Sequence, residues 1–271
     1  MCNEAFEGRA FAGICRALRT AGYTGIEIAP FTLAADPLEI TASKRREYRD
    51  TMASEGIAFA GLHWLMVAPK GLHLTAPDAA LRAQSWAHIR NLIELCADLG
   101  PSGVMVLGSP KQRCITGGLS RAETTAHLTD GLAAMAPHAA ERGVKLLLEA
   151  LPANQCDIVQ TLAEAVGIVR QISSPGLGTM FDVHNAIDEH EPHDRLIERH
   201  FEYIQHVHLN ELDGRHCGAG DYDFTPVLAA LARLRYGGWL SLEAFDFSPG
   251  AERIANESLR HLERASGRIA A

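Results

Sequence analysis

The sequence predicts a (β/α)8 barrel, also called a TIM barrel, that spans residues 1–271 as a single domain. Strand-like apolar runs alternate with helix-like runs along the whole chain, and this alternation is typical of folds with a parallel sheet. Several strand-like runs are almost continuously apolar, as expected for parallel strands that are buried on both faces. The length of 271 residues and the hydrophobic fraction of 47% suit one barrel with a large core.

The elements follow one another in a regular order. Strands are predicted at 25–30, 57–64, 103–110, 144–151, 177–184, 203–210 and 238–245. Helices are predicted at 9–21, 43–55, 78–99, 121–142, 160–172, 192–201, 225–235 and 250–267. A complete barrel needs an eighth strand, and only the segment MCNEAF precedes the first helix. We interpret this segment as the C-terminal stub of a first strand, which is truncated or shortened by the choice of start site.

An open, doubly wound sheet shows the same alternation of strands and helices. Its usual mark is a glycine-rich phosphate loop after the first strand, and the sequence contains neither GxGxxG nor GxxxxGK[ST]. The barrel is therefore favoured. Two long loops, 65–78 and 108–120, follow predicted strands on the side where a barrel carries its active site, and we expect the first to act as a lid.

Composition and charge exclude several classes of function. The net charge of −8 and the pI of about 5.9 do not fit the basic surface of a nucleic-acid-binding protein. No apolar run reaches the roughly 18 residues of a membrane span, and the N-terminus lacks the pattern of a signal peptide. The six cysteines are scattered without a CxxC pair, which indicates reduced thiols. We expect a cytoplasmic protein that binds neither nucleic acid nor a membrane.

Four residues at the ends of four predicted strands form the candidate metal site. They are Glu149 in KLLLEALP, Asp182 in GTMFDVHN, His208 in QHVHLNE and Glu243 in WLSLEAF. A barrel gathers the C-terminal ends of its strands at one mouth, so these side chains are expected to meet around one ion. Three carboxylates and one imidazole favour one divalent Mn, Mg or Co ion over a thiolate-type zinc site, although zinc is a further candidate.

With these residues placed, the chain resembles the xylose-isomerase-like family of sugar and sugar-phosphate isomerases and epimerases. The resemblance runs from GYTGIEIAP to the last helix. In ketose 3-epimerases and hydroxypyruvate isomerases of this family, the ends of strands five to eight supply Glu, Asp, His and Glu to one divalent metal. The four residues above match in order and context. The segment GRHCGAGDYDF at 214–224 resembles the family's GRHxPGxGxxDF.

Three positions depart from the pattern of the family. Where many members have a substrate-binding His, this chain has Asn185, and His184 comes one residue earlier. Gln155 replaces a carboxylate of the ketose epimerases, and Gly214 replaces an Arg, with Arg215 adjacent. These differences predict a substrate that is not the one of the named ketose epimerases.

The chemistry that the resemblance implies is proton transfer at a carbon next to a carbonyl group, through an enediolate. Glu149 and Glu243 would be acid–base groups as well as ligands, since their strands lie on opposite sides of the mouth. Asp182 and His208 would be structural ligands. We expect Glu211 or Gln205 to fix the ring of His208, because a ligand His usually bonds through its other nitrogen.

Seven residues near strand ends are expected to contact the substrate: His63, Trp64, Lys111, Arg113, His184, Asn185 and Arg215. The two cations at 111 and 113 suit an anionic substrate with a phosphate or a carboxylate. The structural alternatives are core packing for the residues at 63 and 64, a solvated loop for 111–113, and an ion pair with Asp213 for Arg215. His206, Glu27 and Glu4 are expected to support the site or to face it.

The leading hypothesis is a metal-dependent isomerase or epimerase of a small sugar, keto sugar or sugar acid, phosphorylated or not. An inosose or dehydroshikimate dehydratase on the same scaffold is the alternative, since it removes the same kind of proton. A non-catalytic sugar-binding protein would have lost one of the paired glutamates. The charge of −8 and the missing zinc ligands argue against a DNA-repair endonuclease of the same fold. Family members are often homodimers or homotetramers, and the helix faces leave both states open.

Overall fold

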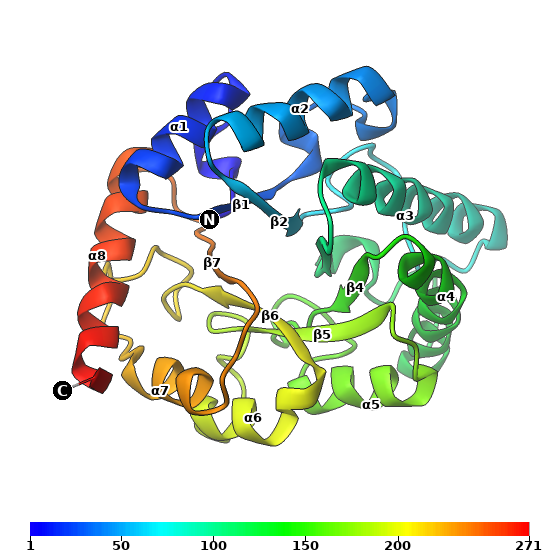
Figure 1. The fold of residues 1–271 in the computed structure, drawn as a ribbon. Helices are drawn as coiled ribbons and strands as arrows, with labels where there is room; N and C mark the ends of the chain where they lie inside the picture. The colour runs from blue at the N-terminus through cyan, green and yellow to red at the C-terminus, as the bar shows by residue number, and fades with distance from the viewer. Residues whose placement is uncertain (271) are drawn as a thin grey trace.

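The computed structural model describes residues 1–270, in which seven parallel strands are paired in sequence order within one sheet. The strands are β1 (Gly25–Ile28), β2 (Ala58–Leu62), β3 (Val104–Leu107), β4 (Lys145–Leu148), β5 (Leu177–Asp182), β6 (Ile204–Leu209) and β7 (Leu240–Leu242). Figure 1 shows these strands curling into a ring that is surrounded by helices. The predicted barrel and its strand order are confirmed.

The N-terminal residues close the gap between β7 and β1. The amide of Cys2 donates to the carbonyl of Leu242 at 2.9 Å, and the amide of Glu27 donates to the carbonyl of Met1 at 3.0 Å. Cys2 also forms a parallel bridge with Glu27. Residues 1–3 therefore occupy the place of the first barrel strand, as the short segment before the first helix predicts.

Eight α-helices form the outer layer of the described part of the chain. They are α1 (Phe11–Ala21), α2 (Ala42–Ser54), α3 (Ala79–Leu99), α4 (Arg121–Glu141), α5 (Leu162–Ile172), α6 (His193–His200), α7 (Thr225–Arg233) and α8 (Ala251–Ala270). Short 3-10 helices lie at η1 (Glu4–Phe6), η2 (Pro30–Thr32), η3 (Pro37–Glu39), η4 (Pro110–Gln112) and η5 (Phe201–Tyr203). Local signals explain several starts, such as the capping box in which Ser120 and Glu123 bond each other's backbone amides at α4.

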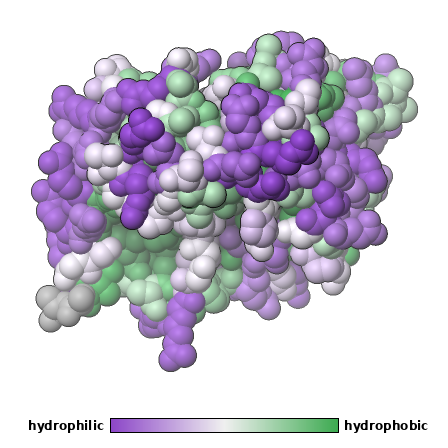
Figure 2. Space-filling model, turned by 45° about the horizontal axis from the view of Figure 1, so that its top comes forward, coloured by the Kyte–Doolittle hydropathy of each residue, from purple (hydrophilic) through white to green (hydrophobic). Residues whose placement is uncertain are grey.

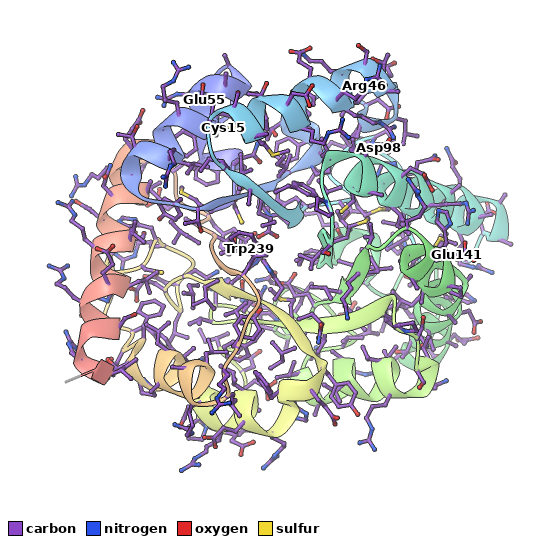
Figure 3. The ribbon with its side chains drawn as sticks, viewed as in Figure 1. Cys15, Arg46, Glu55, Asp98, Glu141 and Trp239 are labelled. Carbon is purple, nitrogen blue, oxygen red and sulfur yellow. The ribbon has the colours of Figure 1, made fainter. Side chains whose placement is uncertain are left out.

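The two ends of the barrel differ in the polarity of the side chains that fill them. Most buried side chains lie between the sheet and the helices, whereas Val104, Val106, Leu147 and Met180 form a separate small cluster. Charged residues of the helices point outward and Trp239, just before β7, lies at the centre of the ring (Figure 3). A Cβ at Gly25 would stand 2.7 Å from the Trp239 indole, which explains the glycine there. The N-terminal end is thus filled by apolar groups, and the polar side chains gather at the other end.

The loop after β2 is anchored rather than free. Leu65, Met66 and Leu74 are buried, and the amide of Leu74 donates to the carbonyl of Gln112 at 2.7 Å. The segment that the sequence predicts to be a lid therefore forms a wall in this conformation.

Hydrophilic residues cover much of the face that Figure 2 shows, with hydrophobic patches between them. Within residues 1–270, no helix combines the length and the apolar character that are needed to cross a membrane.

Candidate active site and metal centre

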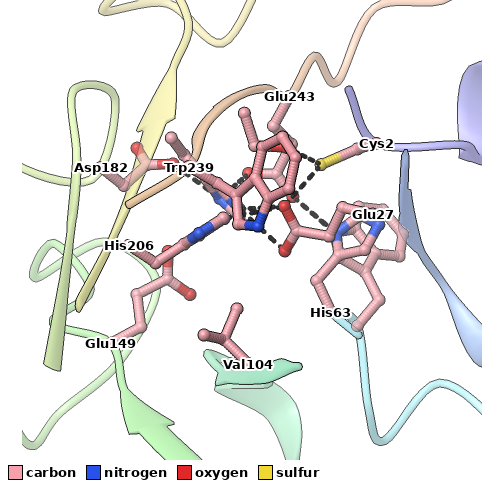
Figure 4. Close-up of polar contacts among 12 residues, drawn as sticks. Cys2, Glu27, His63, Val104, Glu149, Asp182, His206, Trp239 and Glu243 are labelled. Carbon is pink, nitrogen blue, oxygen red and sulfur yellow. Dashed lines mark hydrogen bonds and ion pairs between the residues drawn. The ribbon is translucent and has the colours of Figure 1, made fainter. Parts of the chain in front are cut away.

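The four predicted ligands meet at the C-terminal ends of their strands. Glu149 follows β4, Asp182 ends β5, His208 lies near the end of β6 and Glu243 follows β7. All four are at most 6% exposed. Glu149, Asp182 and His208 each offer a ligand atom within 4.8 Å of the others. Glu243 joins them through His208, whose Nδ1 lies 3.1 Å from Oε2 of Glu243. Figure 4 shows Glu149, Asp182 and Glu243 pointing into the ring from different strand ends.

The ring of His208 is oriented by a residue on the far side of the barrel. Nδ1 of His208 faces the acidic cluster, 3.5 Å from Oδ2 of Asp182. Nε2 faces Glu27, whose carboxylate oxygens lie 3.1 and 3.2 Å away. The same carboxylate lies 2.8 Å from Nε2 of His206. Glu27 thus fixes the ring so that Nδ1 is the nitrogen available for a metal.

The expectation that Glu211 or Gln205 fixes His208 is wrong. Glu211 accepts hydrogen bonds from the amides of Gly218 and Tyr222 at 2.7 and 3.1 Å, and so shapes the glycine loop after β6. Gln205 lies on β6, and its side chain donates to the carbonyl of Glu202 at 3.4 Å. Proximity in sequence suggested these residues, but the residue that reaches the ring comes from β1.

Two asparagines position the carboxylates, and one of them is absent from the sequence-based candidates. The side chain of Asn185 donates to Oε1 of Glu149 at 2.8 Å, and the backbone N–H of Asn185 donates to Oδ1 of Asp182 at 2.7 Å. Asn210 donates to Oδ2 of Asp182 at 3.1 Å. The signal for Asn210 is its place in the strand end QHVHLN, two residues after His208.

His63 and Trp64 lie directly behind the other glutamate. The indole Nε1 of Trp64 donates to Oε1 of Glu243 at 2.9 Å, and Nδ1 of His63 lies 3.3 Å from the same oxygen. Nε2 of His63 lies 3.0 Å from Oε2 of the buried Glu4. Trp64 adopts a left-handed backbone with φ of 52°, a strained conformation for a bulky residue that is found most often at functional sites.

The two glutamates have opposite electrostatic environments. Burial raises the pKa of Glu149 to about 8, and the negative charges of Asp182 and Glu243 add to the effect. Burial also opposes the charge of Glu243, but the neighbouring His208 and His63 overcome it and hold the pKa of Glu243 below its usual range. One side of the site thus favours a neutral acid, and the other favours a carboxylate.

This cluster fits a bound cation. Three buried carboxylates surround one imidazole nitrogen, and mutual repulsion among the acids contributes to the raised pKa of Glu149. A divalent cation would relieve that repulsion. Oxygen-rich donors with one imidazole suit a hard or borderline ion. The residues Glu149, Asp182, His208 and Glu243 are therefore able to hold a divalent metal.

A cavity of about 390 Å³ opens above these residues. Glu149 and Glu243 both line it, together with His63, Trp64, Asn185, Gln155, Lys70, Lys111, Gln112 and Phe245 among others. The rings of Trp64 and Phe245 are stacked, with centroids 6.3 Å apart. Gly108 also lines the cavity, and a Cβ there would overlap Oε2 of Glu149, so glycine leaves room for the carboxylate.

Two of the predicted substrate contacts, both arginines, lie elsewhere. The fully buried Arg113 donates to the carbonyl oxygens of Glu149 and Leu107, at 2.7 and 3.4 Å. The guanidinium of Arg215 pairs with Asp213 at 2.7 Å, which matches the alternative interpretation of that residue. Neither arginine lines the cavity, because backbone carbonyls bind the guanidinium of Arg113 and a carboxylate binds that of Arg215.

His184 lies next to the cavity wall without being one of its lining residues. Its Nδ1 lies 2.6 Å from the carbonyl oxygen of Leu212, and its Nε2 lies 3.3 Å from Nε2 of Gln155. Gln155 in turn donates to Oδ1 of Asn185 at 3.1 Å. Of the two predicted substrate contacts that follow Asp182 in the sequence, Asn185 therefore faces the cavity and His184 supports the wall.

The sequence matches the model of the xylose isomerase-like TIM barrel family over residues 15–265, and the chain belongs to this family. The family resemblance that the sequence indicates is confirmed.

Curated relatives of the chain are ketose epimerases. An L-ribulose 3-epimerase from Methylomonas sp. is 25% identical over 251 residues, which cover 92% of this chain and 82% of the relative. A probable ketose 3-epimerase from Synechocystis sp. is 22% identical over 263 residues, covering 90% and 86% of the two chains. These relatives support the classification of the chain as a sugar epimerase or isomerase.

Solved structures share the fold at low sequence identity. D-psicose 3-epimerase from Clostridium cellulolyticum H10, solved with D-tagatose, has a TM-score of 0.83 and 19% identity, with 97% of this chain and 95% of that chain covered. The apo form of 3-keto-D-glucoside 4-epimerase from E. coli has a TM-score of 0.80 and 18% identity, with 98% of each chain covered.

Proposed function

We propose that the protein is a divalent-metal-dependent epimerase or isomerase of a small sugar, keto sugar or sugar acid. The observation that carries this proposal is the pair formed by Glu149 and Glu243. Both line one cavity, both adjoin the candidate metal cluster, and they come from strands on different sides of the ring. The names of the curated relatives point to the same class of reaction.

Glu149, Asp182, His208 and Glu243 would hold the ion. A bound divalent ion stabilises the negative charge that develops on the oxygen of a carbonyl group next to the reacting carbon. The preferred ion is manganese, magnesium or cobalt, because three of the four donors are carboxylates.

The two glutamates would move the proton. Oε1 of Glu149 accepts a hydrogen bond from Asn185. The other oxygen, Oε2, lies beside Gly108 in the cavity wall and would be the one that holds or takes a proton. Glu243 is kept ionised by the imidazoles and by the Trp64 indole that donates to its Oε1, so it is suited to act as the base. One glutamate removes a proton from one face of the substrate carbon, and the other returns a proton to the opposite face, which inverts the centre.

The cavity also supports a negatively charged substrate. The chain has four lysines, and two of them, Lys70 and Lys111, line the cavity. Lys44 pairs with Glu47 at 2.6 Å, whereas Lys70 and Lys111 have no carboxylate partner within the part of the chain that the structure describes. Two unpaired ammonium groups at the rim suit a phosphate or a carboxylate on the substrate end away from the metal cluster. His63, Trp64 and Asn185 would contact the reacting end.

Solvent-deuterium incorporation tests this function. Chelated protein would be incubated in deuterated water with Mn, Mg, Co or Zn and a panel of ketoses, ketose phosphates and sugar acids. We expect metal-dependent exchange at a carbon next to the carbonyl and an epimeric or isomeric product. Loss of water from the product would indicate a dehydratase instead. Binding of substrate without exchange, with metal present, would contradict an enzyme of either kind.

The charge of the substrate has its own test. Replacing both lysines, in the variant Lys70→Met/Lys111→Met, should raise the KM for an anionic substrate by about 10- to 100-fold, since each charged hydrogen bond contributes roughly 1.5–3 kcal/mol when it is made in full and less at an exposed rim. The variant Lys145→Met, at the opposite end of β4, is the matched control. An equal effect on neutral and anionic substrates would contradict the anion site.

A further inference from the structure

Two cysteines bridge two of the loops that form the cavity. Cys114 follows η4 in the loop between β3 and α4, and Cys156 lies in the loop between β4 and α5. Their Sγ atoms are 2.8 Å apart. A disulfide needs sulfur atoms about 2.05 Å apart, so a small side-chain rotation brings the pair to bonding distance. We infer that Cys114 and Cys156 are a redox modification site that closes into a reversible disulfide in the presence of a peroxide.

A buried arginine next to this pair supports the inference. Arg113 is fully buried, and its two terminal nitrogens donate to the neutral carbonyl groups of Glu149 and Leu107. Its Nε has no hydrogen-bond partner among residues 1–270. A buried cation needs a counter-charge, and neutral carbonyls do not supply one. The positive charge of Arg113 favours the thiolate form of Cys156 and so helps to lower the pKa of that thiol.

The two thiols are unequal. The hydrogen bond from Cys114 lowers the pKa of Cys156 to about 6, against the effect of burial and with help from the charge of Arg113. The same hydrogen bond, burial and the nearby Asp157 raise the pKa of Cys114. The thiolate is the nucleophilic form of cysteine, so Cys156 attacks the oxidant and Cys114 resolves the product. Cys114 is partly exposed and gives a small oxidant access to the pair.

The remaining four cysteines react slowly with peroxide because their thiols stay protonated. Burial raises the pKa of Cys2 to about 12 and that of Cys15 to about 11. Burial also raises the pKa values of Cys96 and Cys217. These four thiols stay protonated near neutral pH and react slowly with peroxide, which makes oxidation selective for the pair.

The chemistry balances with hydrogen peroxide as the only co-reactant. The Cys156 thiolate attacks one peroxide oxygen, the O–O bond breaks, a sulfenic acid forms and hydroxide leaves and takes up a proton. The sulfur of Cys114 then attacks the sulfenic sulfur, loses its proton, and expels water as the S–S bond forms. Two thiols and one peroxide give one disulfide and two waters. A small dithiol reverses the reaction by thiol–disulfide exchange.

The disulfide would join two segments of the cavity wall. Gln112 and Gln155, both lining residues, stand within two positions of the cysteines. Gln155 holds the side chain of Asn185, which in turn bonds Glu149. Oxidation would therefore restrain the loops next to the site, and local opening of these loops should become rarer. This inference does not depend on the proposed function.

Peptide mapping tests the disulfide directly. The full-length protein would be treated with hydrogen peroxide at neutral pH, blocked with N-ethylmaleimide and digested without reduction. We expect a cross-linked peptide pair that contains Cys114 and Cys156 and has lost two hydrogen atoms, and dithiothreitol should restore both thiols. The variant Cys15→Ser, the matched control, should form the same cross-link. Oxidation of another cysteine first, or full N-ethylmaleimide labelling of both residues after peroxide, would overturn the inference.

Two further readouts separate the roles of the thiols. In Cys114→Ser, the sulfenic acid on Cys156 has no resolving partner, so we expect its capture by dimedone, whereas Cys156→Ser should give no adduct at Cys114. In the wild-type protein, trypsin cleavage after the exposed Lys111 should slow by about fivefold in the disulfide form, because cleavage requires local opening. Capture at Cys114 instead, or unchanged cleavage, would contradict the assigned roles or the restraint of the loop.

Discussion

Glu149 and Glu243 are chemically identical side chains at the ends of β4 and β7, yet their surroundings differ. Glu149 receives one amide hydrogen bond, from Asn185, and its remaining neighbours in the cluster include acids that raise its pKa. Glu243 receives a bond from the Trp64 indole and lies against two imidazoles that lower its pKa. The side chains around each glutamate therefore favour a proton on Glu149 and a negative charge on Glu243.

The first prediction concerns the stability of the metal-free protein. Glu243→Gln removes the anion that lies 3.1 Å from Nδ1 of His208, while Glu27 stays beside the other ring nitrogen, so it should lower the free energy of unfolding by about 1.5–3 kcal/mol. Glu149→Gln should not lower the free energy of unfolding at pH 7 and should raise it, because the amide keeps the hydrogen bond from Asn185 and needs no proton, whereas the wild type takes up a proton on Glu149 when it folds. Urea denaturation at pH 7 measures both.

Equal destabilisation by the two substitutions would contradict the difference in charge state. Asp246→Asn, at a partly exposed position beyond β7, is a matched control for the loss of a carboxylate and should have little effect.

The second prediction concerns the residue that orients His208. Glu27→Gln keeps the shape of the side chain but weakens the bonds to both imidazoles, so metal affinity should fall by about 10- to 100-fold. Isothermal titration with manganese measures the affinity. Glu211→Gln, which alters the glycine loop rather than the His208 contact, should affect metal affinity much less. An equal loss of metal affinity in both variants would contradict the inference that Glu27 orients the ring of His208.

The third prediction is a dependence of stability on pH. The pKa of Glu149 rises from the ordinary 4.5 to about 8 in the folded, metal-free protein. Between these values the folded state holds a proton that the unfolded state has lost, so the contribution of Glu149 to stability declines as pH rises from about 4.5 to about 8. The difference in unfolding free energy between wild type and Glu149→Gln isolates this contribution. A flat difference curve would contradict the raised pKa.

Much of the fold was predictable because it depends on local patterns. Alternating runs gave the seven strands and eight helices, and the short segment before α1 gave the closing stub that pairs with β1 and β7. The four candidate ligands were predictable as well, since each stands at the end of an apolar run and the barrel brings such ends together.

The contacts between distant segments were not predictable in the same way. Nothing around Glu27 in the sequence indicates that its carboxylate reaches His206 and His208 across the closed sheet. Likewise, Arg113 comes after a strand end, where substrate-binding residues are common in a barrel. In the structure its guanidinium is buried and donates to the backbone carbonyl of Glu149, which follows the next strand. Such pairings depend on the register of the strands and on side-chain direction, which one sequence does not specify.

The proton-transfer roles of Glu149 and Glu243 are tested most directly by exchange with each of two epimeric substrates in deuterated water. With metal present, the wild-type protein should exchange the proton of both epimers. Glu149→Gln should exchange one epimer only, and Glu243→Gln should exchange only the other, because each variant retains the acid–base group on one face of the substrate carbon. Loss of exchange with the same epimer in both variants, or unchanged exchange in either, would contradict the assignment of one glutamate to each face.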